Sequence, residues 1–375
     1  MTPTEPTRPS APFSEGAVSV ARPISSGGDP FGTHRVIVPE GSLPQPAQRL
    51  DADFARIFEG ELLLAVETLN IDAASFRQMA GVGPDGVETE AGIAGVPGKV
   101  LETIAARGKQ HNPVTGSGGM LLGRVLQIAP GRLPEDLQPG DRVASLVSLS
   151  LTPLRVDKVH RVRAVSAQLD VEGEAVLFQS GAYAKLPTDM PERLALAVLD
   201  VAGAAPQVAR LVKPDMTVLV LGAGGKSGVL CAAEARRRAG PGGRVLGIES
   251  FATYADDLRA LGICDEVLVM DATDPVRVRQ AVLAANQGRE VDVCFSCVNV
   301  ADAEMAAILS TRSRGIVYFF AMSTSFTKAA LGAEGVGKDV DLQIGNGYAI
   351  GHAEHTLKMM RELPHVRALF EKRYG

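Results

Sequence analysis

The chain has 375 residues, of which 46% are hydrophobic and 5% aromatic, with 40 glycines and a formal net charge of −5. This length suits two domains with separate cores, and the glycine content favours an α/β protein with many tight turns over a coiled coil. The negative charge argues against nucleic acid and anionic membranes as partners. No segment has the apolar length of a membrane helix and no apolar signal core is found, so a cytoplasmic protein is expected.

The first half of the chain predicts a tail and a β-rich domain. Residues 1–30 are rich in Pro, Ser, Thr and Gly and predict a flexible tail, after which the β-rich domain is expected over 31–190. Hydrophobic patterns and turn residues predict the following elements there: a strand at 61–70, a short helix at 73–79, a helix starting near Pro97 and ending near Lys109, and strands within 112–128 and 137–149.

The stretch at 216–231, M-T-V-L-V-L-G-A-G-G-K-S-G-V-L-C, contains the clearest signal in the chain. Its apolar run at 218–221 predicts a strand buried on both faces. The glycines that follow have the spacing G-x-x-G-x-x-G, which lets the backbone approach a pyrophosphate at the start of the next helix. The residues expected to bind a dinucleotide here are Gly222, Gly224, Gly225, Lys226, Ser227 and Gly228.

An acidic residue completes this dinucleotide signature. Glu249 ends the next predicted strand, 244–250, and lies 21 residues after Gly228. A carboxylate at this point accepts hydrogen bonds from the adenosine ribose hydroxyls and repels a 2′-phosphate. The sequence therefore predicts NAD rather than NADP as the cofactor.

Four more apolar segments follow, and they predict strands at 266–274, 291–300, 315–323 and 340–348. With the two strands before them they make six, the number in a doubly wound parallel Rossmann sheet. The dinucleotide-binding domain is accordingly expected over 191–351. Asn299 and Val300, at the end of the fourth strand, are expected to line the cofactor.

The cysteines predict no metal or redox site. All four lie in the second half in apolar or strand-like surroundings, which predicts buried, reduced thiols at Cys231, Cys264, Cys294 and Cys297. The C-x-x-C formed by Cys294 and Cys297 falls on a predicted strand, where an odd separation puts the two side chains on opposite faces.

The order of these segments resembles the medium-chain dehydrogenase/reductase superfamily. The resembling features are a glycine-rich loop before a strand, P-G-D-R-V at 139–143, K-L-P at 185–187 and an Ala-rich helix before the nucleotide strand. The resemblance implies a β-rich GroES-like catalytic domain joined to a Rossmann domain. It also implies that a helix over 352–375 returns to complete the first domain.

Longer blocks are similar to one family, the L-erythro-3,5-diaminohexanoate dehydrogenases. They include G-T-H-R-V-I, N-P-V-T-G-S-G-G-M-L and S-T-S-F-T-K-A-A-L-G-A-E-G-V-G-K-D-V-D, and the resemblance covers about 31–375. It implies NAD-dependent oxidative deamination of a small diamino acid, L-erythro-3,5-diaminohexanoate, to 5-amino-3-oxohexanoate, NADH and ammonia in lysine fermentation. A homo-oligomer, dimer or tetramer, is also expected.

The resemblance carries one informative difference from zinc-dependent members of the superfamily. Those members have a Cys where this chain has Asn-Ile-Asp at 70–72, and G-H-E where it has T-G-S-G-G at 115–119. Tetrahedral zinc needs about four N, S or O ligands, and no Cys/His cluster in the sequence supplies them. A zinc-independent enzyme without metal ligands is therefore predicted.

Oxidative deamination sets the side chains to look for in the first domain. The reacting amine must lose its proton, which calls for a nearby carboxylate or other base. Asp72 is the first candidate for an amine contact or base, and capping of the helix at 73–79 is the alternative role. The other polar candidates expected around it are Ser75, Thr115, Ser117 and Ser148.

The second domain adds candidates in a polar loop expected at 323–341, at the carboxyl ends of the strands where ligands bind. Lys328 is the candidate for the substrate carboxylate, with ordinary solvated loop charges as the alternative. The candidate amine ligands in this loop are Glu334, Asp339 and Asp341. Candidate proton carriers are His352 and, less so, His34, and Asp200 is expected as a buried group beside the nicotinamide.

Two other functions fit the same motifs. A zinc-independent quinone or enoyl reductase of the superfamily has the same nucleotide turn but usually takes NADPH, which Glu249 disfavours. A non-catalytic dinucleotide-binding protein would bind NADH without turnover, and the charged residues at 326–341 argue for a polar substrate instead.

Overall fold

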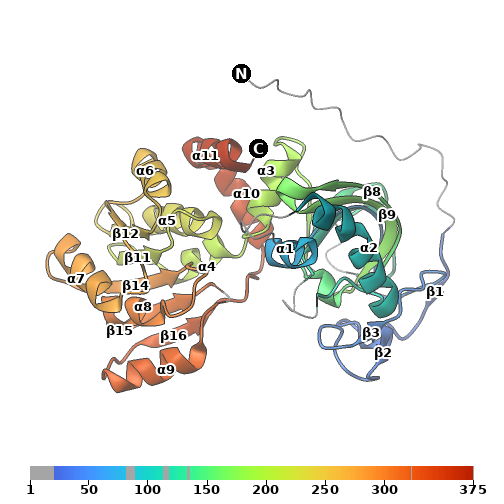
Figure 1. The fold of residues 1–375 in the computed structure, drawn as a ribbon, viewed down its shortest axis with the longest axis horizontal. Helices are drawn as coiled ribbons and strands as arrows, with labels where there is room; N and C mark the ends of the chain where they lie inside the picture. The colour runs from blue at the N-terminus through green and yellow to red at the C-terminus, as the bar shows by residue number, and fades with distance from the viewer. Residues whose placement is uncertain (1–20, 82–88, 113–117, 133–135, 322, 375) are drawn as a thin grey trace. The chain divides into compact units, whose positions relative to one another are not determined.

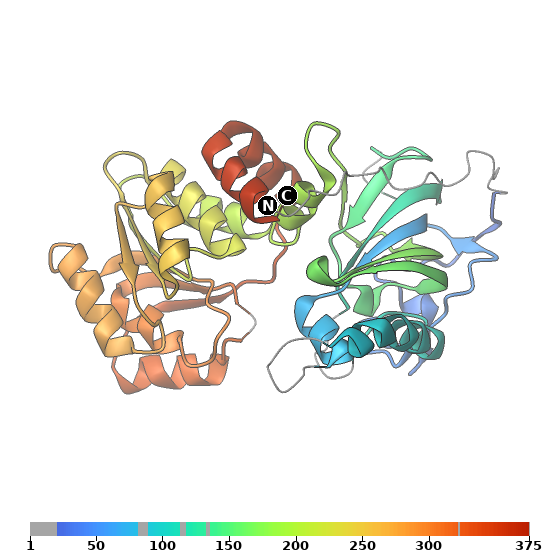
Figure 2. The ribbon, with the colours of Figure 1, turned by 45° about the horizontal axis from the view of Figure 1, so that its top comes forward.

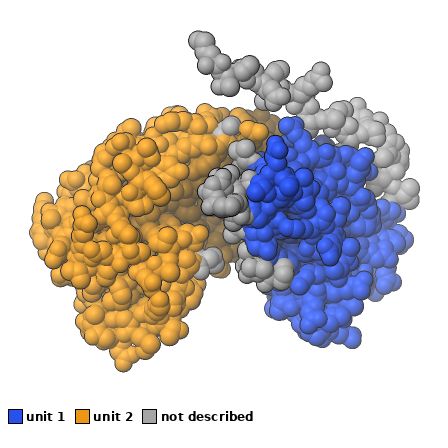
Figure 3. Space-filling model, viewed as in Figure 1, with its two compact units in different colours: residues 1–185 blue, residues 186–375 orange. Residues whose placement is uncertain are grey.

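A computed structural model provides the structure of the chain, and it describes residues 21–81, 89–112, 118–132, 136–321 and 323–374. The chain divides into two compact units, residues 1–185 and residues 186–375. Figure 3 shows these units in blue and orange. Each unit has its own buried hydrophobic cluster, as two domains require.

The first unit is built on a six-stranded antiparallel sheet with the order β10-β7-β6-β5-β9-β8, of which Figure 1 labels β8 and β9. The central strand β5 (Leu62–Asn70) pairs on one side with β6 (Met120–Ile128) and on the other with β9 (Gln168–Leu177). The remaining strands of this sheet are β7 (Arg142–Ser145), β8 (Leu154–Arg163) and β10 (Tyr183–Lys185). Two short pairs accompany it: β1 (Ile24–Ser25) with β4 (Ile57–Phe58), and β2 (Val36–Val38) with β3 (Arg49–Leu50).

The described residues of this unit also form the helices α1 (Ala73–Ala80) and α2 (Glu90–Arg107) and the 3-10 turns η1 (Thr33–Arg35), η2 (Leu149–Leu151) and η3 (Ala164–Ser166). The predicted start of the second helix near Pro97 was wrong, because α2 begins at Glu90 and holds Pro97 inside it. The start is set by Thr89, whose hydroxyl accepts a hydrogen bond from the Gly92 amide at 3.0 Å. Val96, Val100 and Ile104 form the buried face of α2, which joins the core of the sheet.

The second unit is an all-parallel six-stranded sheet with the order β13-β12-β11-β14-β15-β16. Its strands are β11 (Thr217–Leu221), β12 (Arg244–Glu249), β13 (Glu266–Val269), β14 (Val291–Ser296), β15 (Thr311–Phe319) and β16 (Asp341–Ile344). All six predicted strands are present, and strand order reverses between β11 and β14. The predicted fold class, a doubly wound Rossmann sheet preceded by a β-rich domain, is confirmed.

Helices connect and flank these strands (Figures 1 and 2). They are α3 (Glu192–Leu199), α4 (Ala204–Leu211), α5 (Lys226–Ala239), α6 (Ala252–Leu261), α7 (Pro275–Ala285), α8 (Glu304–Ser310), α9 (Phe326–Gly335), α10 (His352–Glu362) and α11 (Pro364–Tyr374). The predicted interruption at Pro364 separates α10 from α11. Both helices contact α3, and α11 also contacts α5 and α6. Completion of the first domain by 352–375 stays a prediction.

No single helix in the described ranges is long and apolar enough to cross a membrane. The pair α3 and α4, bent by 49°, would meet the same criteria of length and composition if taken together.

Candidate functional site

The glycine-rich turn follows β11 directly, and two of its glycines are required by the turn itself. Gly222 has φ +71°, a left-handed conformation that L side chains rarely adopt. A Cβ on Gly228 would lie 2.1 Å from the Gly222 carbonyl oxygen, so α5 could not pack this closely with any larger residue there. These two glycines therefore shape the turn, whatever it binds.

Gly225 differs, because the protein leaves the space beside it open. It is the N-cap of α5 with φ −73°, and a Cβ there would meet only the Gly222 oxygen, at 3.7 Å. No side chain caps α5, so the amide groups of its first turn, at Lys226, Ser227 and Gly228, are available to an anion. The turn has the form of a diphosphate site.

Glu249, the last residue of β12, lies against this turn. Its side chain is buried, with 5% of the residue exposed, and Oε2 accepts a hydrogen bond from the Gly224 amide at 2.9 Å. Oε1 accepts another from the Phe251 amide at 3.1 Å. These bonds hold the carboxylate beside the glycine loop, where the adenosine ribose of a dinucleotide binds.

The opposite side of the turn is formed by the chain after β14. The backbone at Cys297 and Val298 lies against Gly222, since a Cβ on that glycine would be 3.1 Å from the Val298 nitrogen. Asn299 and Val300 follow and are exposed. They leave the sheet next to β11, where strand order reverses and where ligands of this fold bind.

The polar loop predicted at 323–341 was wrong, because Phe326–Gly335 forms α9. The Ser325 hydroxyl caps this helix by accepting a hydrogen bond from the Lys328 amide at 3.3 Å. Strand β16 is parallel to β15, with Asp341 opposite Ile316 and Ile344 opposite Phe319. The helix therefore returns the chain to the amino edge of the sheet.

This return separates the candidates that the prediction had grouped together. Lys328 stays near the carboxyl edge, whereas Glu334, Asp339 and Asp341 come after the chain has returned and are all exposed. Asp339 faces Arg314, with 3.8 Å between Oδ2 and Nε. The placement of these three acids at the carboxyl ends of the strands was wrong.

Two lysines of the second unit are already paired. Lys328 forms an exposed ion pair with Asp302, and this hydrogen bond raises the pKa of Lys328. Lys226 pairs with Asp200, with 3.0 Å between Nζ and Oδ2. The prediction of Asp200 as a buried group was wrong, because its side chain is 47% exposed and points to this lysine.

In the first unit, Asp72 has the capping role that was considered for it, and its role as an amine contact or base stays a prediction. Its Oδ1 accepts a hydrogen bond from the Ser75 amide at 2.8 Å and so caps α1. Its Oδ2 is buried and has no hydrogen-bond partner in the described part of the chain. Ser75 is fully buried in the same turn. One carboxylate oxygen thus remains for a ligand, which an N-cap alone does not require.

Two further polar residues were missed by the sequence reasoning. Gln110 is fully buried, yet neither atom of its amide has a partner in the described residues. The buried Nδ1 of His111 likewise has none, and burial lowers the pKa of His111. Buried polar groups are normally paired, so such atoms point to a ligand. The available signal was the polar run K-Q-H-N at 109–112 between two apolar elements.

The chain at Gly118 and Gly119 links these polar residues to Asp72. A Cβ on Gly118 would lie 2.2 Å from the Gln110 carbonyl oxygen, and one on Gly119 would lie 2.9 Å from Cα of Ile71. Gly118 also lies against the Ser150 amide, because a Cβ there would be 2.6 Å from the Ser150 nitrogen. The hydroxyl groups of Ser150 and Ser148 share a hydrogen bond of 2.8 Å. Thr115 and Ser117 lie outside the described residues. The backbone at Ile71 and that at Gln110 thus meet at Gly118 and Gly119, and on this ground we call Asp72, Gln110 and His111 the polar cluster of the first unit.

The histidines proposed as proton carriers have different surroundings. The His34 ring accepts from the Asp29 amide at Nδ1 and lies 2.9 Å from Glu61 at Nε2, so both nitrogens are engaged. His352, the first residue of α10, is 6% exposed, and burial lowers its pKa. Its ring packs edge-on against Tyr348, with 5.1 Å between centroids. His352 is therefore held neutral more readily than a solvated histidine.

The cysteines are all free, with Cys231 and Cys294 buried as predicted and Cys264 and Cys297 only half-buried. The sulfur of Cys297 lies 3.7 Å from that of Cys231 of α5, a contact that was not predicted. This contact and burial raise the pKa of Cys231, which keeps the thiol protonated.

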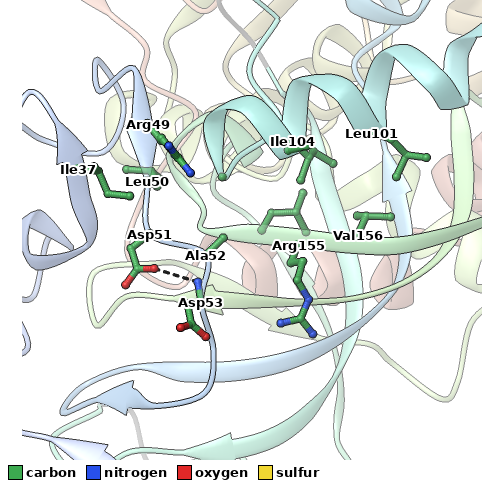
Figure 4. Close-up of a pocket in the computed structure, with 13 residues that line it drawn as sticks. Ile37, Arg49, Leu50, Asp51, Ala52, Asp53, Leu101, Ile104, Arg155 and Val156 are labelled. Atoms are coloured by element: carbon green, nitrogen blue, oxygen red, sulfur yellow. Dashed lines mark hydrogen bonds between the residues drawn. The ribbon is translucent and has the colours of Figure 1, made fainter.

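A hollow of about 440 Å³ lies elsewhere in the first unit, between α2, β3 and β8 (Figure 4). Its charged lining residues include Asp51, Asp53 and Arg155, and Asp51 accepts a hydrogen bond from the Asp53 amide at 2.9 Å. None of the predicted site residues lines it. Within the described ranges, no three His, Cys, Asp or Glu side chains are grouped to hold a metal ion, and independence from zinc stays a prediction.

Comparison with solved structures defines the class of protein. AibC has a TM-score of 0.51 at 17% identity, with 82% of each chain covered. The quinone oxidoreductase of Escherichia coli, solved with NADPH, has a TM-score of 0.51 at 16% identity, covering 82% of this chain and 80% of that chain. At such identities the likeness concerns the fold alone, which is that of the medium-chain dehydrogenases/reductases.

Sequence comparison identifies the family. Residues 34–187 match the family model described as the L-erythro-3,5-diaminohexanoate dehydrogenase N-terminal domain. The L-erythro-3,5-diaminohexanoate dehydrogenase of Acetoanaerobium sticklandii is 52% identical over 349 residues, 92% of this chain and 98% of that protein. The protein of that name from Fusobacterium nucleatum subsp. nucleatum is 50% identical over 347 residues, again 92% and 98%. The chain belongs to the L-erythro-3,5-diaminohexanoate dehydrogenase family, and its cofactor is a nicotinamide dinucleotide.

Proposed function

We propose that the protein catalyses the NAD-dependent oxidative deamination of L-erythro-3,5-diaminohexanoate to 5-amino-3-oxohexanoate, NADH and ammonia. The observation that carries this proposal is 52% identity to a dehydrogenase of that name over 98% of its length. The open diphosphate site at Gly225 and the carboxylate of Glu249 support the cofactor half of the reaction.

The preference for NAD over NADP rests on Glu249. Its carboxylate is buried against the glycine loop by the amides of Gly224 and Phe251. Two oxygens held in this way accept hydrogen bonds from two ribose hydroxyls. A 2′-phosphate would instead bring a second negative charge against a buried carboxylate, which is costly in a low dielectric.

A dinucleotide held at the glycine turn would supply the acceptor for the hydride, with its electron pair, that leaves C3 of the substrate. The nitrogen on C3 must be neutral, because its lone pair forms the carbon–nitrogen double bond as the hydride leaves. Water then adds to C3 and ammonia departs. Aliphatic amines have pKa values near 10, so the chain must accept a proton from this amine and later assist the water.

We assign the proton-accepting role to Asp72. Its Oδ1 is used by the cap of α1, and its buried Oδ2 is left to accept a proton or an N–H group. Gln110 and His111 supply buried groups without a partner among the described residues of the same unit, and these suit the second amine, the carboxylate or the attacking water. The backbone of the α5 first turn holds the diphosphate.

The direct test follows NADH at 340 nm with L-erythro-3,5-diaminohexanoate as the sole amine. We expect substrate-dependent NADH formation that rises toward alkaline pH, with NAD used at least ten times better than NADP, as about 1.4 kcal/mol of discrimination would give. Turnover of quinones or enoyl thioesters with NADPH, without amine oxidation, would favour the reductase alternative. NADH binding without any amine turnover would favour a non-catalytic protein.

A further inference from the structure

The last turn of α11 reaches the glycine turn at two points. Arg373 donates a hydrogen bond from Nη1 to the Gly224 carbonyl oxygen at 2.6 Å. The next residue, Tyr374, has its ring centre 5.2 Å from Nζ of Lys226. The two contacts lie on either side of Gly225, at the start of α5 where the diphosphate is expected. A segment far along the chain thus touches the dinucleotide loop.

The Arg373 side chain is fixed in this position by three interactions besides the loop contact. Its Nη2 and Nε donate to Oδ2 of Asp257 at 2.6 and 3.1 Å. Its guanidinium carbon lies 4.3 Å from the ring centre of Tyr254. The side chain is only 10% exposed. Charge-assisted bonds and a cation–π contact in such shelter hold a guanidinium in one geometry.

The Gly224 peptide groups are consequently held from both sides. The amide of Gly224 donates to Glu249 and its carbonyl oxygen accepts from Arg373. Tyr254 is close as well, because a Cβ on Gly224 would lie 2.6 Å from Cβ of Tyr254. The ribose-binding carboxylate, the loop and the arginine therefore form one connected set of bonds.

Arg373 is not the only residue that docks α11. The buried residues of this helix are Val366, Leu369 and Phe370, one to two turns earlier, and they anchor it to the unit. Removing the guanidinium should therefore release the glycine loop while the helix stays in place. A role in folding alone would not require a bond to a carbonyl of the dinucleotide loop.

We propose that Arg373 is a positioning residue for the dinucleotide: by holding the Gly224 carbonyl, it sets the glycine loop for the diphosphate and Glu249 for the adenosine ribose. This deepens the proposed function, on which it rests for the identity of the ligand. The group concerned is the ADP-ribose half of the cofactor. Arg373 acts through the loop and takes no part in hydride transfer.

The chain offers a matched control in Lys372. Its Nζ pairs with the other oxygen of the same carboxylate, Asp257 Oδ1, at 3.0 Å, but its bonds do not include the glycine loop. Arg373→Ala and Lys372→Ala each remove one positive charge from the same turn and from the same partner. Only the first removes the bond to Gly224.

The test measures binding of NADH by fluorescence titration and of ADP-ribose by calorimetry, without the amine. We expect Arg373→Ala to weaken both ligands about tenfold, the loss of one charge-assisted hydrogen bond. Arg373→Lys keeps the positive charge but loses the two-pronged guanidinium, so its affinity for both ligands should lie between those of Arg373→Ala and the unchanged protein. Lys372→Ala should stay within about twofold of the unchanged protein. The KM for NAD should rise in Arg373→Ala with kcat little changed.

Several results would overturn the assignment of Arg373. Binding of both ligands to Arg373→Ala as tight as to the unchanged protein would end it, and so would an equal loss in Lys372→Ala. If Arg373→Ala does not fold, undiminished affinity of Arg373→Lys for NADH and ADP-ribose would likewise overturn the assignment. Failure of the proposed function is separate: the unchanged protein would then bind ADP-ribose and NADH but oxidise no diamine.

Discussion

We propose that the glycine turn of the second unit binds mainly through backbone groups, whereas the polar cluster of the first unit binds through side chains. In the turn, both the amide and the carbonyl of Gly224 have hydrogen-bond partners, and the space beside Gly225 is open. In the polar cluster, buried atoms of Asp72, Gln110 and His111 have no partner in the described residues. A dinucleotide is held by backbone shape, which needs no unpaired side chain. A diamino acid requires side-chain groups matched to its charges.

The largest effect of a single substitution is expected at Gly225. Gly225→Asp should abolish NADH binding, by more than about 100-fold or about 3 kcal/mol, because a carboxylate would occupy the space at the helix start where the diphosphate belongs. The fold should remain, since a Cβ there meets nothing closer than 3.7 Å. Fluorescence titration and circular dichroism measure the two effects. Gly98→Asp, at a position with open space on α2, is the control for the added charge. Unchanged NADH affinity in Gly225→Asp would contradict binding of the dinucleotide at this turn.

The next largest effect is expected at Asp72. Asp72→Asn should lower kcat by about 100-fold, the usual contribution of a general base. The amide can still cap α1, because asparagine is as good an N-cap as aspartate. Steady-state kinetics and thermal unfolding separate the two roles.

The control for Asp72→Asn is Asp274→Asn, the same exchange at the N-cap of α7. This variant should keep full turnover. Full turnover in Asp72→Asn as well would leave Asp72 with capping as its whole function.

In Gln110→Leu, stability should rise while the affinity for the diamino acid falls. Replacing an unpaired buried amide by an apolar side chain should stabilise the fold by about 1 kcal/mol. The KM for the diamino acid should rise about tenfold, with the KM for NAD unchanged. Gln168→Leu is the contrast, because the Gln168 amide donates to Asn70 at 3.2 Å and its loss should destabilise. Destabilisation by Gln110→Leu with unchanged kinetics would show that Gln110 is an ordinary core residue.

The smallest effect concerns pH and His352. Burial lowers the pKa of His352 in the fold below 6.5, so the unfolded chain takes up a proton first as the pH falls. The contribution of this histidine to stability is therefore full above 6.5 and is lost as the pH falls through the lower pKa of the folded state. His352→Gln should reduce the loss of thermal stability between pH 7 and pH 5, by about 1 kcal/mol or less. An identical pH profile for both proteins would contradict this.

The sequence could predict what depends on local patterns. The spacing from Gly222 to Gly228 and the acid 21 residues later are consequences of one strand–turn–helix–strand unit, so both could be recognised without the structure. The six parallel strands followed from their apolar runs. In the first unit, the start of α2 was missed because the hydroxyl of Thr89 outweighs the usual preference of proline for a helix start.

Residues brought together by long-range folding could not be predicted. Glu334 and Asp339 were placed wrongly because α9 reverses the chain, and strand pairing decides at which edge a residue lies. Asp200 was expected to be buried, but its side chain is 47% exposed and pairs with Lys226, which lies 26 residues later in the chain. The contact of Arg373 with Gly224 joins residues 149 apart in the chain, and no local pattern predicts it.

In the proposed reaction, a hydride moves from the amine-bearing C3 of the substrate to NAD. The most direct measurement uses L-erythro-3,5-diaminohexanoate carrying deuterium at C3 and determines the mass of the NADH formed and the amount of ammonia released. We predict one deuterium in each NADH and one ammonia for each NADH. NADH without deuterium, or deuterated NADH without ammonia, would contradict the proposed reaction.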